Sequence, residues 1–332
     1  MGEARKHHYV PVFYQAHFAN SKGLLWVYDR RLKTYKELHP RVICFQSDLY
    51  TLKRKDGPSE RRIESQLLSF IDGLGSSAIR NILSGNRTRE AVHALAYFIG
   101  IQIHRIPSFA RQISEMYVSS AEEMMRLMSV DVGRMQSVLE RVQGAGKSID
   151  VSAESMVEAI RGKQIEVAAT EVPFLSHIFG QAESISDVLA GVDWQILVAP
   201  NITGFIICDD PVVVVPPAGS RFVGFLVPGT VSYFPLTRKF CLRLCSTKSS
   251  IYRKISKETV QTVNYNIAAH SERFVMGPDK AQLMSTVLNS SSSEEDSAPR
   301  YTIEMLNQDD HGSFQKLTIH PRRYFYLKGS AP

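Results

Sequence analysis

The sequence predicts an α+β protein, in which a central helical bundle packs on a C-terminal antiparallel sheet and short N-terminal strands come first. Apolar residues recur at helical intervals through the middle of the chain, from about 59 to 190. From 193 onward, short β-rich runs alternate with Pro, Gly and Asn. Helices in succession followed by strands in succession indicate an α+β order and not an alternating βαβ one.

The N-terminal part alternates short apolar pieces with turns. The pieces "YVPVFY", "LLWVYD" and "RVICFQ" fall between residues 9 and 50. Runs of this length, rich in aromatic and β-branched residues and bounded by turns, predict short strands or loops laid over a larger body.

The helical part begins where the apolar period changes. The stretch "SERRIESQLLSFIDGLGSSAIRNIL" predicts a helix that starts at Pro58 or Ser59. The next stretch, "REAVHALAYFIGIQIHRIPSFARQISEMY", predicts a helix that Pro107 kinks or interrupts, because proline lacks the backbone donor. Pro173 predicts a break in the last segment. Further helices are predicted at about 120–142, 152–162 and 164–190.

The sheet part contains the strand-like runs "WQILVA", "GFIIC", "VVVV", "RFVGFLV" and "FCLRLC". A helix at about 256–274 is expected to return and pack on the sheet. The segment "NSSSSEEDSAP", 289–299, has almost nothing to bury and predicts a mobile loop. The stretch "SFQKLTIHPRRYFYL" predicts a closing strand or hairpin.

Composition is that of an ordinary globular protein. The chain has 332 residues, of which 44% are hydrophobic and 22% are charged, enough for one large domain or two smaller ones. Its net charge of +6 suits an anionic partner but is too small for a protein that coats nucleic acid. Basic residues gather at 29–41 and 52–62, where they indicate a solvated surface or a nucleic-acid patch.

Cysteine usage and hydropathy narrow the class further. No two cysteines have the C-x-x-C spacing, which argues against a zinc ribbon and favours buried free thiols. No apolar leader segment follows Met1, and no run of about 18 apolar residues predicts a membrane span. We therefore expect a cytoplasmic protein that does not associate with membranes. The cysteines are Cys44, Cys208, Cys241 and Cys245.

Two stretches carry side chains suited to metal or general-base chemistry. In "KHHYVPVFY", His7 and His8 are adjacent, so in an extended chain at most one of them can face a given pocket. In "ICDDPVV", two carboxylates stand before a proline-induced turn, where Asp209 suits a metal or general-base position. The same aspartate equally suits an Asx-turn.

Two helices carry polar residues at unfavourable positions. Gln102 and Arg105 share one face of an otherwise apolar helix, so a carboxylate or a phosphate must meet the guanidinium. Glu64 is a candidate partner, and the pair predicts a buried ion pair or a substrate clamp. Asn264, in "VNYNIAAHSERF", predicts a specific bond, to a ligand or to the backbone of the sheet. That stretch also holds Asn266, His270 and Arg273.

Sharper signatures of catalysis are absent from the sequence. It contains no G-x-x-x-x-G-K-[ST], no G-x-G-x-x-G, no H-E-x-x-H and no G-x-S-x-G. P-loop nucleotide hydrolysis and α/β-hydrolase chemistry are therefore not expected.

Five stretches, taken in order, resemble the family called domain of unknown function 4238. They are "KHHYVPVFYQAHFA", "FIGIQIHRIPSFAR", "FIICDDPVVV", "YFPLT" and "VNYNIAAHSERFV". The resemblance implies one family domain at 1–277, with its helical part at about 59–190 and its sheet part at about 193–277. A C-terminal extension at 278–332 would follow.

The resemblance also carries over positions to test. Members of the family typically open with K-x-H-Y-V-P-x-x-Y-L-x-x-F and later carry T-S-D-x-P-V. Gln15 stands here for the usual leucine, and "ICDDP" keeps Asp209 without the hydroxyl-bearing residues before it. The matching polar residues come from four separate elements, as a pocket shared between bundle and sheet would need. They are His8, Arg105, Asp209 and Asn264, with Glu64 added on a weaker alignment.

Two classes of function follow from these residues. The first is a metal-dependent nuclease-like effector of the phage-defence or toxin type that acts on nucleic acid with Mg²⁺ or Mn²⁺. In it, His8, Asp209 and Glu64 are the catalytic candidates, and Asp209 and His8 hold the metal. Arg105, Gln102 and Asn264 would bind the substrate. The second is a non-catalytic binding or regulatory module in which the same residues form a structural network. An enzyme acting on another anionic substrate is a third alternative, and the oligomeric state is left open.

Overall fold

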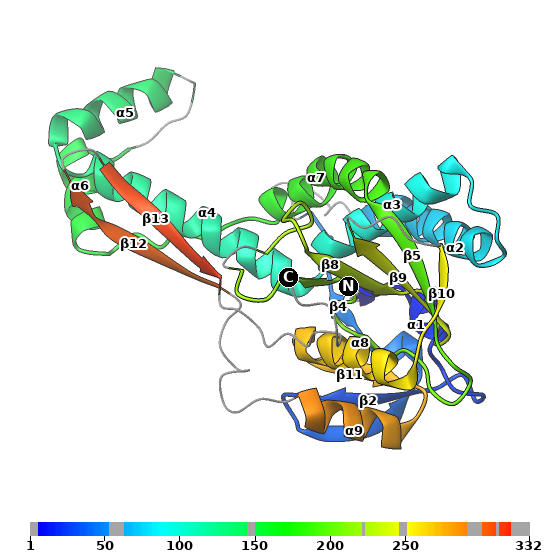
Figure 1. Ribbon diagram of the computed structural model, residues 1–332. Helices are drawn as coiled ribbons and strands as arrows, with labels where there is room; N and C mark the ends of the chain where they lie inside the picture. The colour runs from blue at the N-terminus through cyan, green and yellow to red at the C-terminus, as the bar shows by residue number, and fades with distance from the viewer. Residues whose placement is uncertain are drawn as a thin grey trace. The chain divides into compact units, whose positions relative to one another are not determined.

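The computed structural model describes residues 6–52, 63–144, 146, 150–220, 223–245, 251–290, 301–309 and 312–319, and the side chains of 63–65 and 301–319 lie outside that description. The predicted α+β class is confirmed, since many helices accompany several small sheets (Figure 1). Contacts divide the chain into two compact units. Unit 1 lies within 1–110, 175–302 and 317–332, and unit 2 within 111–174 and 303–316. The predicted family domain at 1–277 and its extension stay a prediction.

Helices make up most of the middle of the chain. A π-helical turn, Ile63–Leu68, leads into the first long helix, and the predicted start at Pro58 or Ser59 lies outside the described residues. No helix in the described segments is long and apolar enough to cross a bilayer. The helices are α1 (Val12–Ala16), α2 (Ser69–Leu83), α3 (Arg89–His104), α4 (Pro107–Met128), α5 (Val132–Gly144), α6 (Ala153–Arg161), α7 (Val172–Gly191), α8 (Lys257–His270) and α9 (Lys280–Ser290).

Helix ends follow local chemistry. The hydroxyl of Thr88 accepts the N–H of Ala91 at 3.2 Å and caps α3. Pro107 interrupts the helix as predicted, because α3 ends at His104 and Pro107 opens α4, where a missing donor costs nothing. Pro173 likewise falls in the first turn of α7, so the helix predicted from 164 begins only at Val172. The helix predicted at 120–142 is broken at 129–131 between α4 and α5.

A five-stranded sheet forms the centre of unit 1. Its order is β10-β5-β9-β8-β7. The pairs β5–β9, β8–β9 and β7–β8 are antiparallel, whereas β10 runs parallel to β5. The sheet is thus antiparallel except at one edge. Its strands are β5 (Asp193–Val198), β7 (Val213–Val215), β8 (Val231–Pro235), β9 (Phe240–Cys245) and β10 (Tyr252–Lys254).

A second sheet joins distant parts of the chain. Its order is β3-β2-β11-β6, so β2, from the N-terminal part of the chain, pairs antiparallel with β11, which follows α8. Two smaller sheets are the pairs β1–β4 and β12–β13. Strand β13 covers the first part of the stretch predicted to form a closing strand or hairpin, and the rest of that stretch lies outside the described residues. The strands are β1 (Lys6–His8), β2 (Leu25–Asp29), β3 (Thr34–Leu38), β4 (Phe45–Ser47), β6 (Ile207–Cys208), β11 (Phe274–Gly277), β12 (Tyr301–Asp309) and β13 (Gly312–Ile319).

Three local predictions differ from the structure. The stretch "YVPVFY" contains α1 and no strand, and residues 223–227 of "RFVGFLV" form turns. The helix predicted to 274 ends at His270, because Ser271 is extended with φ −63° and ψ 143°, and β11 begins at Phe274. In each case, tertiary contacts outweigh the local propensity of the sequence.

The core of unit 1 lies on both faces of the five-stranded sheet. On one face, Phe234 of β8 stacks on Tyr14 of α1 with ring centroids 5.0 Å apart and meets Phe98 of α3 at 6.2 Å. In Figure 1, α3 and α7 lie on this side of the sheet and α8 lies on the other. The segment that follows β1 is therefore placed between the helices and the sheet.

Candidate functional site

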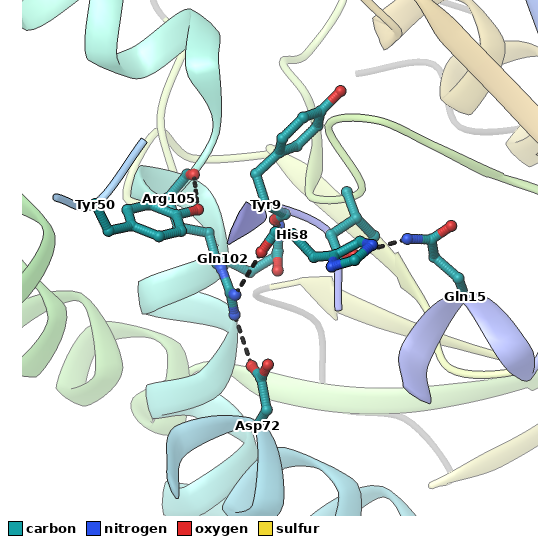
Figure 2. Close-up of polar contacts among 8 residues, drawn as sticks. His8, Tyr9, Gln15, Tyr50, Asp72, Gln102 and Arg105 are labelled. Atoms are coloured by element: carbon teal, nitrogen blue, oxygen red, sulfur yellow. Dashed lines mark hydrogen bonds and ion pairs between the residues drawn. The ribbon is translucent and has the colours of Figure 1, made fainter. Parts of the chain in front are cut away.

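Buried side chains of α3 hold the main chain of the opening segment, His7–Tyr14. Gln102, fully buried, donates from Nε2 to the carbonyl oxygen of Tyr9 at 2.8 Å. Arg105 donates from one guanidinium nitrogen to the carbonyl oxygen of His8 at 2.8 Å (Figure 2). From α1, Gln15 Nε2 donates to the carbonyl oxygen of Val10 at 2.8 Å. The resembling stretches "KHHYVPVFYQAHFA" and "FIGIQIHRIPSFAR" are thus joined through main-chain hydrogen bonds.

Arg105 meets its counter-charge inside unit 1. Its side chain is 2% exposed and lies 2.6 Å from a carboxylate oxygen of Asp72 on α2. Burial alone would lower the pKa of the guanidinium, but Asp72 outweighs burial and raises it. The hydroxyl of Tyr50 donates to the carbonyl oxygen of Arg105 at 2.6 Å. The partner seen is therefore Asp72, and the side chain of Glu64 lies outside the described residues.

The two adjacent histidines point to opposite sides, as the extended chain predicts. His7 is fully buried and stacks on Tyr50 with ring centroids 5.5 Å apart. Its Nδ1 accepts the N–H of Tyr50 at 3.0 Å. His8 is partly exposed, and its Nε2 lies 3.1 Å from the carbonyl oxygen of Arg41.

Asn264 binds the backbone that precedes β6. Its Oδ1 accepts the N–H of Ile206 at 3.2 Å, and its Nδ2 donates to the carbonyl oxygen of Gly204 at 2.9 Å. The side chain is 1% exposed. Of the alternatives open for this asparagine, the contacts seen are with the backbone beside the sheet.

Asp209 also binds main-chain groups. Its two carboxylate oxygens accept the N–H groups of Glu272 at 2.9 Å and of Arg273 at 2.7 Å. The residue is 5% exposed. Burial and the charge of Glu272 raise the pKa of Asp209 to about 6, although the N–H of Arg273 opposes the shift. Asp209 thus fixes the loop between α8 and β11.

The same loop is held from the second sheet. Arg273 donates from Nε and from a terminal nitrogen to Asp29 at 3.0 and 2.9 Å. Burial opposes ionisation of Asp29, but these hydrogen bonds from Arg273 lower its pKa. Arg30 donates to the hydroxyl of Ser271 at 2.6 Å and to the carbonyl oxygen of Ala268 at 2.5 Å.

A histidine and a carboxylate pair beside Asp209. His270 Nε2 lies 3.1 Å from a carboxylate oxygen of Asp210, with the side chains 17% and 6% exposed. Arg273, 38% exposed, follows three residues later. We call Asp29, Asp209, Asp210, His270 and Arg273 the Asp-His-Arg cluster.

Tyr9 and Cys44 lie on the buried side of this cluster. Burial raises the pKa of Tyr9 well above its ordinary value, and the charges of Cys44 and Asp209 act in the same direction. Burial likewise raises the pKa of the Cys44 thiol. Both groups are therefore neutral at physiological pH, and they are suited to packing and hydrogen bonding more than to nucleophilic attack.

Within the described part of the chain, no three His, Cys, Asp or Glu side chains gather in a way that could hold a metal ion. His8 contacts the main chain at Arg41, and Asp209 contacts the loop after α8. The divalent metal predicted at His8 and Asp209 stays a prediction.

The buried carboxyl of Asp209 should make stability depend on pH. Because its folded pKa of about 6 exceeds the ordinary value of 3.8, the folded state holds this proton more tightly. Its contribution to stability is therefore present below pH 4 and is lost as the pH rises through 6, by up to about 3 kcal/mol. In urea unfolding between pH 4.5 and 7.5, Asp209→Asn should become progressively more stable relative to the parent.

The matched control for this measurement is Asp131→Asn. Asp131 is exposed and accepts one main-chain N–H, from Gly133 at 3.0 Å. Its profile should run parallel to that of the parent. If the pH profile of Asp209→Asn also runs parallel to that of the parent, the pKa of Asp209 is not raised.

The sequence alone does not mark several members of the cluster as site residues. Asp29 ends a strand-like run and gave no signal beyond its charge. Asp210 directly follows Asp209 in the chain, and His270 and Arg273 lie in the same stretch as Asn264. The sequence cannot show that "ICDDP" and "HSERF" are adjacent in the fold, because Asp210 and His270 are 60 positions apart.

Comparison with known proteins identifies one family model. Residues 6–281 match the model described as "Protein of unknown function (DUF4238)". The match confirms the resemblance inferred from the five stretches. No curated protein and no solved structure matches the chain.

Proposed function

The chain belongs to the family described as proteins of unknown function (DUF4238), and from that premise we propose that it is a non-catalytic binding or regulatory module whose polar residues form a structural network. One observation carries this proposal. Gln102, Arg105 and Asn264, three of the residues expected to bind substrate, donate to or accept from main-chain atoms of their own chain.

The pattern of these bonds supports the proposal further. Each joins elements that are distant in sequence: α3 to the opening segment, α8 to the approach of β6, and the turn after β6 to the start of β11. Each bond involves at least one of the five stretches that resemble the family. The network is satisfied only in part, because Gln102 Oε1, Gln15 Oε1 and Arg105 Nε are buried without a hydrogen-bond partner among the described residues. The bonds that do reach main-chain groups hold the elements they join in one arrangement.

One observation favours a second candidate, cleavage of nucleic acid. An imidazole 3.1 Å from a carboxylate and partly exposed is the arrangement of a general base. Arg273, three residues later in the chain, pairs with Asp29 and is 38% exposed, and a guanidinium of this kind is suited to a phosphate. In this alternative His270 takes the role first given to His8, and a divalent metal would be supplied in solution.

The two candidates are separated by a cleavage assay. Purified protein is incubated with plasmid DNA and with total RNA in Mg²⁺ or Mn²⁺, beside His270→Ala and His93→Ala. His93 is a partly exposed histidine of α3 outside the cluster. We expect no cutting by any of the three proteins, while a commercial nuclease added to the same buffers cuts both substrates.

Cleavage by the parent protein would contradict the proposal that the protein is a non-catalytic module. If cutting is lost in folded His270→Ala and kept in His93→Ala, the second candidate replaces the first. Circular dichroism of each variant shows whether it is folded.

A further inference from the structure

A groove with a volume of about 420 Å³ lies between α4 and α5 within unit 2. Its apolar side comes from α4 and its charged side from α5. Met124 is 58% exposed there, although a flexible apolar side chain of this kind is usually buried. The lining residues are Met124, Leu127 and Met128 of α4 and Arg134, Ser137, Val138 and Arg141 of α5.

The groove is not the inner face of this helical unit. The inner face of α5 carries Met135 and Leu139, which pack on Ala153 and Val157 of α6. Arg134, Val138 and Arg141 lie one step round the helix from that core. Met128 of α4 also packs against this core, so the groove borders the core there, whereas Met124 is 58% exposed and open to a partner.

The charged side of the groove has a regular spacing. Arg134 and Arg141 are exposed and seven residues apart on one helix, two turns or about 10.5 Å. In the portion of the chain that the structure describes, neither forms an ion pair. Arg141 donates from Nε to the carbonyl oxygen of Ser137 at 3.2 Å. By contrast, Arg126 on the nearby part of α4 is held by Glu123 at 2.7 Å.

We propose that this groove docks an amphipathic helix of a partner protein that carries two acidic residues seven positions apart with apolar residues between them. The α5 face reads Arg-x-x-Ser-Val-x-x-Arg, so its complement is acidic-x-x-apolar-apolar-x-x-acidic, the i, i+3, i+4, i+7 face of a helix. Exposed methionines adapt to such a face because their side chains are flexible. This inference rests on the proposed function, for which it names the class of partner.

The spacing of the arginines favours a helix over a lipid. A fatty acid or an anionic lipid presents one head group, which meets one guanidinium at a time, whereas two carboxylates two turns apart meet both. Carboxylate is also a bidentate acceptor for arginine. A vesicle surface is therefore the alternative outcome of the test and not the expected one.

The test uses two fluorescein-labelled 18-residue helical peptides that differ only in charge. Both carry leucine at peptide positions 9 and 10, and positions 6 and 13 are glutamate in one and lysine in the other. By fluorescence anisotropy, the full-length protein should bind the glutamate peptide at least tenfold more tightly than the lysine peptide. The double variant Arg134→Glu/Arg141→Glu should reverse that preference.

A matched double variant controls for net charge. Arg89→Glu/Lys257→Glu changes the charge equally at exposed first-turn positions of α3 and α8, and should bind as the parent does. Equal affinity of the parent for both peptides, or an unchanged preference in the groove variant, would overturn the proposal. So would binding to phosphatidylglycerol vesicles without binding to either peptide.

The same preparations are put through the nucleic-acid cleavage assay, so that two failures can be told apart. Cleavage by the parent overturns the module whatever the peptides do. Absence of cleavage together with absence of peptide preference overturns the groove alone. The variant Met124→Gln keeps both arginines and provides a second readout. It should lower the affinity for the glutamate peptide at least threefold.

Discussion

Replacing Arg105 by alanine should lower the free energy of unfolding by about 3–5 kcal/mol. The side chain is 2% exposed, pairs with Asp72 at 2.6 Å and donates to the carbonyl oxygen of His8 at 2.8 Å. Its removal takes one donor from the carboxylate of Asp72, whose side chain is 25% exposed, and one from the main-chain carbonyl of His8. Its guanidinium also lies 5.9 Å from the ring centroid of Tyr50, a contact that is lost too. Urea unfolding at pH 7 measures the change.

A second ion pair provides the matched control. Arg126 binds Glu123 on the same helix, at 2.7 Å, with its side chain 49% exposed. Because water screens and solvates this pair, Arg126→Ala should change the free energy of unfolding by less than about 1 kcal/mol. If Arg105→Ala unfolds at the same urea concentration as Arg126→Ala, Arg105 does not hold the opening segment in place.

Asn264→Ala should lower the free energy of unfolding by about 2–4 kcal/mol. The substitution leaves the buried N–H of Ile206 without its acceptor. Because Asn264 is only 1% exposed, the substitution also opens a small cavity. The carbonyl oxygen of Gly204 keeps one donor, because Gln282 Nε2 also binds it, at 2.5 Å. Thermal and urea unfolding measure the loss.

The shared acceptor makes a sharper version of this experiment possible. Gln282→Ala alone should have a small effect, whereas the double variant with Asn264→Ala should lose more than the sum of the two single variants. Asn289→Ala is the control, since Asn289 is exposed and, among the described residues, donates to the carbonyl oxygen of Ser285 on its own helix at 2.7 Å. Simple additivity would show that Asn264 and Gln282 do not act on one carbonyl.

Much of the fold could be predicted from local patterns. The break at Pro107, the strands of "WQILVA" and "FCLRLC" and the α+β class follow from proline chemistry and from apolar periodicity. The parallel β10–β5 edge and the sheet that joins β2 to β11 could not be predicted. Strand pairing depends on which segments meet, and no local pattern reports that.

The candidate site was predictable only in part. The stretches that contain His8, Arg105, Asp209 and Asn264 were identified, and so was the family. The partners were not: Arg105 meets Asp72, and Asp209 meets the loop after α8. A polar residue at an unfavourable position in the sequence needs a hydrogen-bond partner. The sequence does not show whether that partner is the main chain, a side chain or a ligand.

By itself, the sequence determined many of the elements, the family and the need for buried polar partners, because propensity, proline geometry and desolvation act within a few residues of each position. Only the tertiary structure decided what those residues bind. Arg105 reaches a carbonyl 97 positions away, Gln102 one 93 positions away and Asn264 one 60 positions away. Hydrogen bonds act over about 3 Å of space, and which groups come within that distance depends on how the whole chain folds.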